Sequence, residues 1–178
     1  MNKKEIKTPL TDDVIKTLKV GETVYLTGHV YTARDAAHKR LCEMLEQGFS
    51  MPIEFEGQIV FYAGPSPTPP GAVIGSIGPT TAVRMDKYSP ILIKEGLKCM
   101  IGKGIRTHEV KEAIKKHTGV YFAQPGGIAA LMSKCITNVE LVAFEDLGTE
   151  AIRKLTVVNM PLIVAVDEQG RDVYERNF

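Results

Sequence analysis

One stretch of the sequence carries a turn, two adjacent hydroxyls and a guanidinium: Gly75-Ser76-Ile77-Gly78-Pro79-Thr80-Thr81-Ala82-Val83-Arg84-Met85-Asp86. The apolar run at 72–74 just before it predicts the end of a strand. The chain then turns at Gly78-Pro79, and Thr80 or Thr81 is expected to be the N-cap of a helix. A threonine oxygen suits that position because it accepts hydrogen bonds from the free amides of a first helical turn.

The start of this expected helix has the properties of an anion site. Unpaired amides and the positive end of the helix dipole point outward there and attract negative charge. Arg84 lies in the same first turn, where a cation is electrostatically disfavoured, and a guanidinium grips a carboxylate with two hydrogen bonds. The stretch therefore predicts a site for a negative ligand. A capped helix with a surface arginine is the alternative that the stretch alone leaves open.

A second junction of the same kind lies earlier, at Tyr31-Thr32-Ala33-Arg34-Asp35-Ala36-Ala37-His38. It follows a predicted strand at 23–31, and Thr32 and Asp35 have the spacing of a capping box for a helix that runs to about residue 47. Arg34 occupies the place that Arg84 has in the later junction. We expect the two junctions to form two halves of one anion pocket. His38 is interpreted as a surface residue paired with Asp35, and catalysis is the alternative.

Helices and strands alternate along the remaining chain, which predicts an α/β fold with short loops. The proline-rich segment 64–71 is expected to be a stiff surface loop. Helices are expected at 11–18, at 89–95 with Ser89 as N-cap, at 109–117 with Thr107 as N-cap, and at 128–132. Strands are expected at 55–63, 97–101, 120–123, 139–144, 161–167 and 172–174.

Composition bounds the class of protein. The chain has 178 residues, of which 44% are hydrophobic and 24% charged, which fits one domain over 1–178. The net charge of +1 gives no basic field for nucleic acid. No apolar run approaches the roughly 20 residues that span a bilayer, and no apolar leader follows the charged N-terminus. We therefore expect a cytoplasmic protein without nucleic-acid or membrane partners.

The three cysteines, Cys42, Cys99 and Cys135, lie far apart and form no C-x-x-C pair. This spacing argues against a disulfide framework and against a zinc or iron–sulfur site built from this chain alone, so no metal ligand is expected. Lys103 stands between Gly102 and Gly104 as a third cation after a predicted strand. The GKG sequence does not match a phosphate-binding P-loop, which needs a longer glycine-rich approach and a Ser or Thr after the lysine.

Three segments, residues 32–38, 78–86 and 102–104, together resemble one protein family. From about Pro9 to Tyr174 the chain resembles the β subunit of class I, iron–sulfur-dependent hydro-lyases, namely fumarate hydratase and L(+)-tartrate dehydratase. The same region forms the C-terminal domain of single-chain members. The resemblance implies a layered, swivelling β/β/α domain that docks on a larger α subunit. It also implies a [4Fe–4S] cluster held by three cysteines of that α subunit, and a β–β contact in an α2β2 assembly.

The resemblance also implies roles for individual residues. Arg34 and Arg84 match the two arginines that bind the carboxylates of a small dicarboxylate substrate, and Lys103 matches a lysine that adds a further contact. Thr80 matches the threonine that handles the proton at the carbon next to the carboxylate, and Thr81 is the less favoured neighbour. Thr80 and Lys103 are thus the expected catalytic residues. A free threonine hydroxyl is a poor base, so Thr80 needs help from nearby cations or from a carboxylate of the partner.

The segment 145–155 resembles the fumarase branch of this family, although Thr149 stands where that branch has a methionine. Reversible hydration of fumarate to L-malate is therefore the first expectation, and dehydration of L(+)-tartrate to oxaloacetate is the second. A non-catalytic module that binds small anions would use the same cations and is the alternative from another class. A stand-alone zinc or flavin enzyme has no ligand cluster or cofactor loop to support it.

Overall fold

The computed structural model describes residues 3–124 and 127–175, which form a mixed α/β fold. The strands are β1 (Lys4–Lys7), β2 (Thr23–Thr32), β3 (Ile59–Phe61), β4 (Cys99–Gly102), β5 (Val120–Ala123), β6 (Ile136–Ala143) and β7 (Ile152–Val166). The α-helices are α1 (Asp12–Lys16), α2 (Asp35–Glu46), α3 (Ser89–Lys94), α4 (His108–His117) and α5 (Ala129–Lys134). Three short 3₁₀ helices are η1 (Ala82–Met85), η2 (Glu145–Glu150) and η3 (Val173–Glu175).

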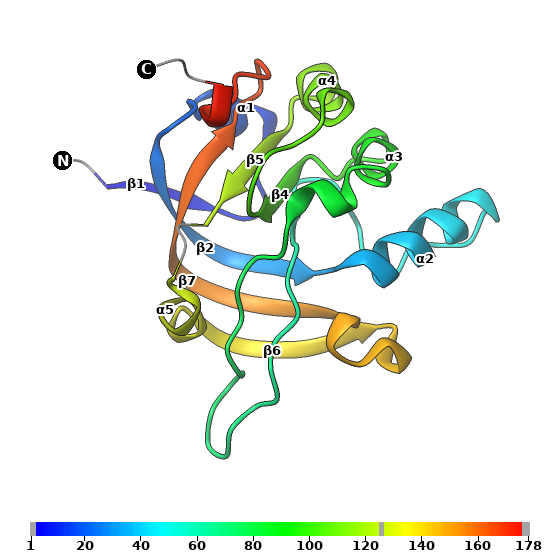
Figure 1. The fold of residues 1–178 in the computed structure, drawn as a ribbon, viewed down its shortest axis with the longest axis vertical. Helices are drawn as coiled ribbons and strands as arrows, with labels where there is room; N and C mark the ends of the chain where they lie inside the picture. The colour runs from blue at the N-terminus through cyan, green and yellow to red at the C-terminus, as the bar shows by residue number, and fades with distance from the viewer. Residues whose placement is uncertain (1–2, 125–126, 176–178) are drawn as a thin grey trace.

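The sheet closes on itself. Its strand order is β1-β2-β3-β4-β5-β7-β6, and β2 also pairs with β7, so β2, β3, β4, β5 and β7 form a barrel-like ring (Figure 1). The strands β1 to β5 run parallel, and β7 runs antiparallel to β2, β5 and β6. The length of β7 allows this closure, since one of its edges pairs with β2 while the other pairs with β6 and then with β5.

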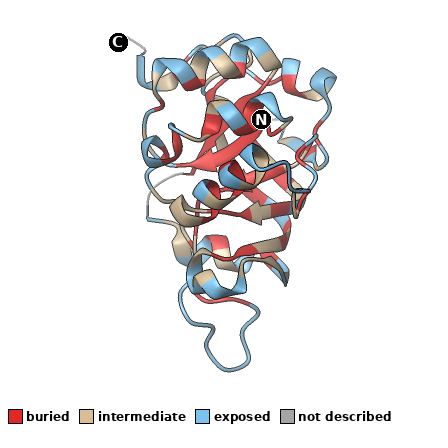
Figure 2. Cartoon of the chain, turned by 90° about the vertical axis from the view of Figure 1, so that its right-hand side faces the viewer, coloured by how far each residue is buried: buried red, intermediate tan, exposed pale blue. Residues whose placement is uncertain are grey.

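Alternating side chains of the strands divide the core into two layers. Ile59 and Phe61 of β3 join a cluster with the alternate residues of β4, β5 and β7, inside the ring. Val60 and Tyr62 point to the other side and pack with residues of α2, α3 and α4. Figure 2 shows buried strands between helices whose outer faces are exposed. The parallel strands therefore present their carboxyl ends, where the predicted site residues follow, on one edge of the ring.

The loop at 62–80 differs from the prediction. The expected strand at 72–74 is wrong: these residues lie in a long irregular loop that projects from the body (Figures 1 and 2). Residues 66–73 of the loop are exposed, and the amide of Ser66 donates to the carbonyl of Ser76 at 2.9 Å near its base. Four prolines between 65 and 70 remove amide donors, which disfavours pairing with a neighbouring strand. The predicted surface loop is confirmed, but it is longer than expected.

Among the expected N-cap residues, a side-chain capping hydrogen bond is present at Thr11 only. The Thr11 hydroxyl of α1 accepts from the amide of Val14 at 3.3 Å, as expected. The capping box at Thr32 is wrong, because this hydroxyl accepts from the amide of Arg153 at 3.1 Å and donates to the carbonyl of Ala151. The start of β7 lies beside the end of β2, so tertiary contacts take the hydroxyl. Helix α2 instead begins after Arg34, whose side chain makes no capping bond.

Several boundaries also moved. The strand predicted at 55–63 is reduced to β3, because Gly57 and its neighbours turn before it. The strand predicted at 172–174 is wrong: Asp172 forms one isolated bridge with Val166, and η3 follows. Ser89 was expected as an N-cap but is the first residue of α3. Thr107 holds the N-cap position of α4 as expected, without a side-chain capping bond. No helix in the described part of the chain combines the length and hydropathy that spanning a bilayer requires.

Candidate functional site

The long loop returns to the carboxyl end of β3 at Thr80. The carbonyl of Tyr62, directly after β3, accepts from the Thr80 amide at 2.7 Å and from the Thr80 hydroxyl at 2.9 Å. Thr80 is therefore not an N-cap, and its hydroxyl proton is held by a backbone oxygen. The lone pairs of that hydroxyl oxygen make no hydrogen bond among the described residues, so they are free to accept one.

Lys103 lies beside the two threonines because the backbone joins them. Thr81 and Lys103 form a parallel bridge: the Lys103 amide donates to the Thr80 carbonyl at 3.2 Å, and the Ala82 amide donates to the Lys103 carbonyl at 2.9 Å. The Lys103 side chain is exposed, and no carboxylate of the described residues lies within ion-pair distance of it. The backbone thus brings Lys103 next to Thr80 and Thr81.

The two arginine junctions also meet. Asp35, the first residue of α2, receives the Arg84 guanidinium, with Nε 3.1 Å from Oδ1 and an Nη 3.0 Å from Oδ2. Arg84 lies in the single turn of η1, where Thr81 holds the N-cap position without a side-chain capping bond. The arginine side chain is 53% exposed, so its charge remains open to solvent beside the ion pair.

Arg34 faces the same edge from the end of β2. Its Nε lies 3.7 Å from a carboxylate oxygen of Glu150 and makes no hydrogen bond among the described residues. Gly64 leaves the room for this guanidinium, since a Cβ added there would lie 3.3 Å from the Arg34 Cδ and 2.7 Å from the Thr149 carbonyl. Both arginines thus stand at one edge of the ring, each next to a carboxylate of its own chain.

The interpretation of His38 as a surface residue paired with Asp35 is wrong. His38 is fully buried, and its Nδ1 donates to the carbonyl of Arg34 at 2.8 Å, one turn earlier in α2. Its ring packs edge-on against Tyr62, with ring centres 5.2 Å apart. Burial lowers the pKa of His38 to about 4, although the bond to the Arg34 carbonyl opposes this. The imidazole is neutral at physiological pH and supports the backbone that carries Arg34.

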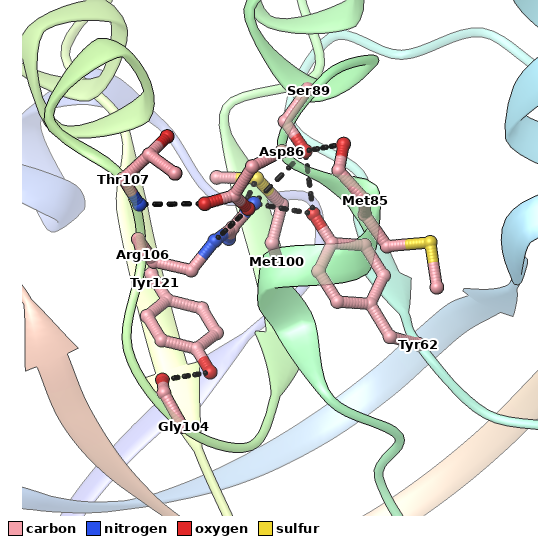
Figure 3. A network of polar contacts seen from close by, with 9 residues as sticks. All are labelled: Tyr62, Met85, Asp86, Ser89, Met100, Gly104, Arg106, Thr107 and Tyr121. Carbon is pink, nitrogen blue, oxygen red and sulfur yellow. Dashed lines mark hydrogen bonds and ion pairs between the residues drawn. The ribbon is translucent and has the colours of Figure 1, made fainter.

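A buried polar network lies beneath the site (Figure 3). The Arg106 guanidinium donates to the Asp86 carboxylate at 2.7 Å, to the Ser89 hydroxyl at 2.9 Å and to the Tyr62 hydroxyl at 3.1 Å. The second carboxylate oxygen of Asp86 accepts from the amide of Thr107 at 2.6 Å. Burial disfavours the charge of Arg106, but the oxygens of Tyr62 and Asp86 raise its pKa above the ordinary value.

This network ties together the two backbone segments that carry the site. Asp86 directly follows η1, which bears Arg84, and Arg106 follows Lys103 at the start of the turn into α4. The Tyr121 hydroxyl donates to the Gly104 carbonyl at 2.9 Å and holds the same turn (Figure 3). No role was predicted for Arg106, because no local sequence pattern distinguishes a buried arginine from a surface one. Asp86 lies in the segment 75–86, but no role was predicted for it either.

The cysteines do not fit the ligand set of an iron–sulfur cluster. Cys42 lies in the outer core layer and Cys99 inside the ring, and burial raises their thiol pKa values to about 11 and about 12. Cys135 is half-buried at the end of α5, and its pKa is raised as well. Cluster ligands must be thiolates, which these environments disfavour. Within residues 3–124 and 127–175, no group of three or more His, Cys, Asp or Glu residues is placed to hold a metal ion.

An open cavity of about 300 Å³ adjoins this edge of the ring. Lys103 and Gln124, which follow the adjacent parallel strands β4 and β5, both line it. The other lining residues are Gly78, Pro79, Gly127, Ile128 and Ala129. A volume of this size lies at the lower end of ligand pockets and suits a small molecule. Of the five predicted site residues, Lys103 lines this cavity, whereas Arg34, Thr80, Thr81 and Arg84 do not.

Comparison with known proteins identifies the family of this chain. A family model described as "Fumarase C-terminus" matches residues 1–177. The chain belongs to the fumarase C-terminus family. The putative L(+)-tartrate dehydratase subunit beta of Methanocaldococcus jannaschii is 40% identical over 172 residues, which cover 93% of this chain and 88% of that protein. The predicted resemblance is confirmed at the level of the family.

Longer relatives also contain this region. Fumarate hydratase 2 of Leishmania major is 39% identical over 98% of this chain, which covers 31% of that protein. The anaerobic class I fumarate hydratase of Escherichia coli is 39% identical over 88% of this chain and 29% of its own length. The chain therefore spans about a third of the fumarate hydratases that it matches. Most of the length of those proteins lies outside the matched region.

Proposed function

We propose that this chain, as one domain over residues 1–178, is the β subunit of an iron–sulfur hydro-lyase that reversibly hydrates fumarate to L-malate. The observation that carries the proposal is the edge of the ring where three parallel strands end. Arg34 follows β2, Thr80 is bound to the residue after β3, and Lys103 follows β4. Arg34, Arg84 and Lys103 with the Thr80 hydroxyl suit a small dicarboxylate, and Lys103 also lines a small cavity. The family and the names of its longer members support the choice of reaction.

The arginines would bind the two carboxylates of the substrate. A guanidinium offers parallel N–H donors that match a carboxylate, and both arginines already face carboxylates, those of Asp35 and Glu150. Exposed ion pairs of this kind contribute about 0–1 kcal/mol, so a substrate carboxylate can replace them at small cost. Thr81, next to Lys103, would add a hydroxyl contact. Lys103 would supply a further positive charge near the developing negative charge of the reaction.

Thr80 would handle the proton at the carbon next to the carboxylate. Its own proton is donated to the Tyr62 carbonyl, so its free lone pairs can face the substrate. A neutral hydroxyl is a weak base, and the neighbouring cation Lys103 would stabilise the negative charge that forms when a proton leaves carbon. No carboxylate of the described residues approaches Lys103 closely enough to neutralise it, so its charge remains available for this role.

The remainder of the active site would come from a larger α subunit. The cysteines of this chain do not fit a cluster, so we propose that the [4Fe–4S] cluster belongs to that partner. The domain would dock on it as a swivelling β/β/α unit, in an α2β2 assembly in the cytoplasm with a contact between β subunits. This arrangement agrees with the chain covering about 30% of the longer relatives.

A second candidate reaction is the dehydration of L(+)-tartrate to oxaloacetate. It is favoured by one observation, the near full-length match to a protein named as a putative tartrate dehydratase β subunit. A non-catalytic anion-binding module is the third candidate, since the same cations would bind a dicarboxylate without turning it over. The two dehydratase reactions need the partner, whereas the binding module predicts dicarboxylate affinity for this chain alone.

The test is an anaerobic co-purification of this chain with its partner from the native host, followed by two assays. Fumarate hydration by the iron-containing complex, absent from the isolated chain, is the expected result. Tartrate dehydration without fumarate hydration would replace the first reaction by the second. An isolated chain that binds fumarate in calorimetry, without a larger partner and without turnover, would contradict the proposal and support the binding module.

A further inference from the structure

Gln124 carries a buried side-chain amide that has no role in the proposed hydro-lyase site. It follows β5 directly, and its backbone amide donates to the carbonyl of Gly102 at 3.3 Å, so it lies beside the residue that precedes Lys103. Its side chain is 5% exposed. Both polar atoms of the amide, Oε1 and Nε2, lack a hydrogen-bond partner among the described residues.

In residues 3–124 and 127–175, no other buried polar or charged side chain lacks every hydrogen-bond partner. His38 bonds through Nδ1, and each of the others makes at least one side-chain hydrogen bond: Thr32, Asp86, Ser89, Arg106, Asp167 and Asp172. A buried amide without partners is costly, so native proteins rarely keep one unless a ligand or solvent completes it. Gln124 also lines the cavity beside Lys103, which is where such a partner would enter.

The chemistry of the amide limits what that partner is. Nε2 needs an acceptor and Oε1 needs a donor, and the adjacent Lys103 adds a positive charge. A carboxylate alone would accept from Nε2 and from Lys103, but it supplies no donor to Oε1. A 2-hydroxy acid satisfies all three, because its carboxylate accepts and its hydroxyl donates. Fumarate carries no hydroxyl, whereas L-malate and tartrate do.

We propose that Gln124 binds the hydroxyl of the 2-hydroxy acid and is a specificity-determining residue of this site. The inference rests on the proposed hydro-lyase function and adds a contact to it. A site that hydrogen-bonds a substrate hydroxyl discriminates strongly against analogues that lack it, because its buried polar groups are then left unpaired. The Oε1 contact is therefore made to the hydrated reactant and the transition state but not to fumarate, whereas the Nε2 contact to a carboxylate is common to all three.

The test is Gln124→Met in the complex of this chain with its partner, with Gln47→Met at the exposed C-cap position of α2 as the matched control. The equilibrium constant of the reaction is fixed, so kcat/KM must fall by the same factor in both directions. A contact with the hydroxyl divides that factor between kcat and KM differently in the two directions. For L-malate dehydration, KM rises about 10-fold or more with kcat nearly unchanged. For fumarate hydration, KM rises less, by the loss of the carboxylate contact alone, and kcat falls by the remainder of the factor.

Three results would overturn the inference. KM values that rise equally in both directions, with kcat unchanged, would indicate a carboxylate contact without a hydroxyl contact, and unchanged kinetic constants would show that Gln124 touches no substrate. A lower midpoint of thermal unfolding in Gln124→Met would show that the amide has a structural partner, whereas removal of an orphaned amide predicts an equal or higher midpoint. A wild-type complex that turns over neither substrate would instead overturn the proposed function, and the role of Gln124 with it.

Discussion

At the scale of single residues, the cations of the site differ in whether a carboxylate of the same chain lies within ion-pair distance. Arg34 and Arg84 each lie next to a carboxylate of their own chain, whereas Lys103 has none within ion-pair distance among the described residues. The sequence could predict that Arg34 and Lys103 gather, because each follows a strand of one parallel set, whereas Arg84 lies in η1 after the irregular loop. It could not predict the pairing with Asp35 and Glu150, since these contacts depend on how η1, η2 and α2 approach one another.

Removal of the Thr80 hydroxyl separates its chemical role from its structural one. In Thr80→Val the Tyr62 carbonyl keeps its bond to the residue 80 amide, so we expect a loss of only about 1 kcal/mol in the free energy of unfolding. Loss of a proton-transfer group costs about 10²–10⁴ in kcat, so kcat of the complex should fall within that range. The matched control is Thr81→Val, for which we expect a fall of less than tenfold. Equal effects of the two changes would contradict the assignment.

His38 makes the stability of the fold depend on pH. Its pKa is lowered to about 4 by burial, against about 6.5 in the unfolded chain, so the unfolded state binds a proton first as the pH falls. The stabilisation is fully present above pH 6.5, and about 3 kcal/mol of it is lost as the pH falls to about 4. Urea denaturation at several pH values should therefore show a shallower loss for His38→Phe than for the wild type. Parallel curves would show that His38 does not titrate in this way.

At the scale of elements, the strand-to-helix junction at 31–38 was predicted correctly except for its capping, whereas the junction at 72–86 was not, because residues 72–74 lie in a loop and only the 3₁₀ turn η1 follows. Alternating apolar residues and glycines located β2, α2, β4 and β5 closely. Thr32 and Thr80 look like caps in the sequence, yet their hydroxyls bond to Ala151 and Tyr62, which are distant along the chain. Sequence patterns such as the capping box predict hydrogen bonds between residues close in the chain. Here backbone carbonyls that are distant along the chain accept from the same hydroxyls.

The network around Arg106 should hold η1 against the turn into α4. Arg106→Met leaves the buried carboxylate of Asp86 without its counter-charge, which costs about 3–5 kcal/mol. The double variant with Asp86→Leu should recover part of this loss, because it removes the uncompensated charge. Urea denaturation of the three proteins measures both effects. Arg40→Met, which breaks an exposed pair with Asp146, is the control and should change little; an equally small effect at Arg106 would contradict a structural role for the network.

At the scale of the whole molecule, closure of the sheet creates the site. Strands β2, β3 and β4 lie side by side in the ring, and their carboxyl ends bring together residues that are up to 69 positions apart, such as Arg34 and Lys103. The prediction captured the α/β class and most elements. It missed the first part of β7, because Arg153, Lys154 and Asn159 interrupt the apolar pattern there. The closing contact between β2 and β7 is therefore a long-range feature that the periodicity of the sequence does not contain.

The measurement that tests the central claim most directly is kcat/KM for fumarate hydration by the anaerobically purified complex carrying Arg84→Ala. Arg40→Ala, on an exposed face of α2, is the matched control. We expect the Arg84 variant to lose activity by at least about 100-fold, because an unpaired substrate carboxylate would lose a charge-assisted contact of about 1.5–3 kcal/mol and its correct orientation. Its free energy of unfolding should remain close to that of the wild type, since the side chain is largely exposed. Retained kcat/KM in a folded, assembled Arg84→Ala complex would contradict the claim that this edge of the ring binds the substrate.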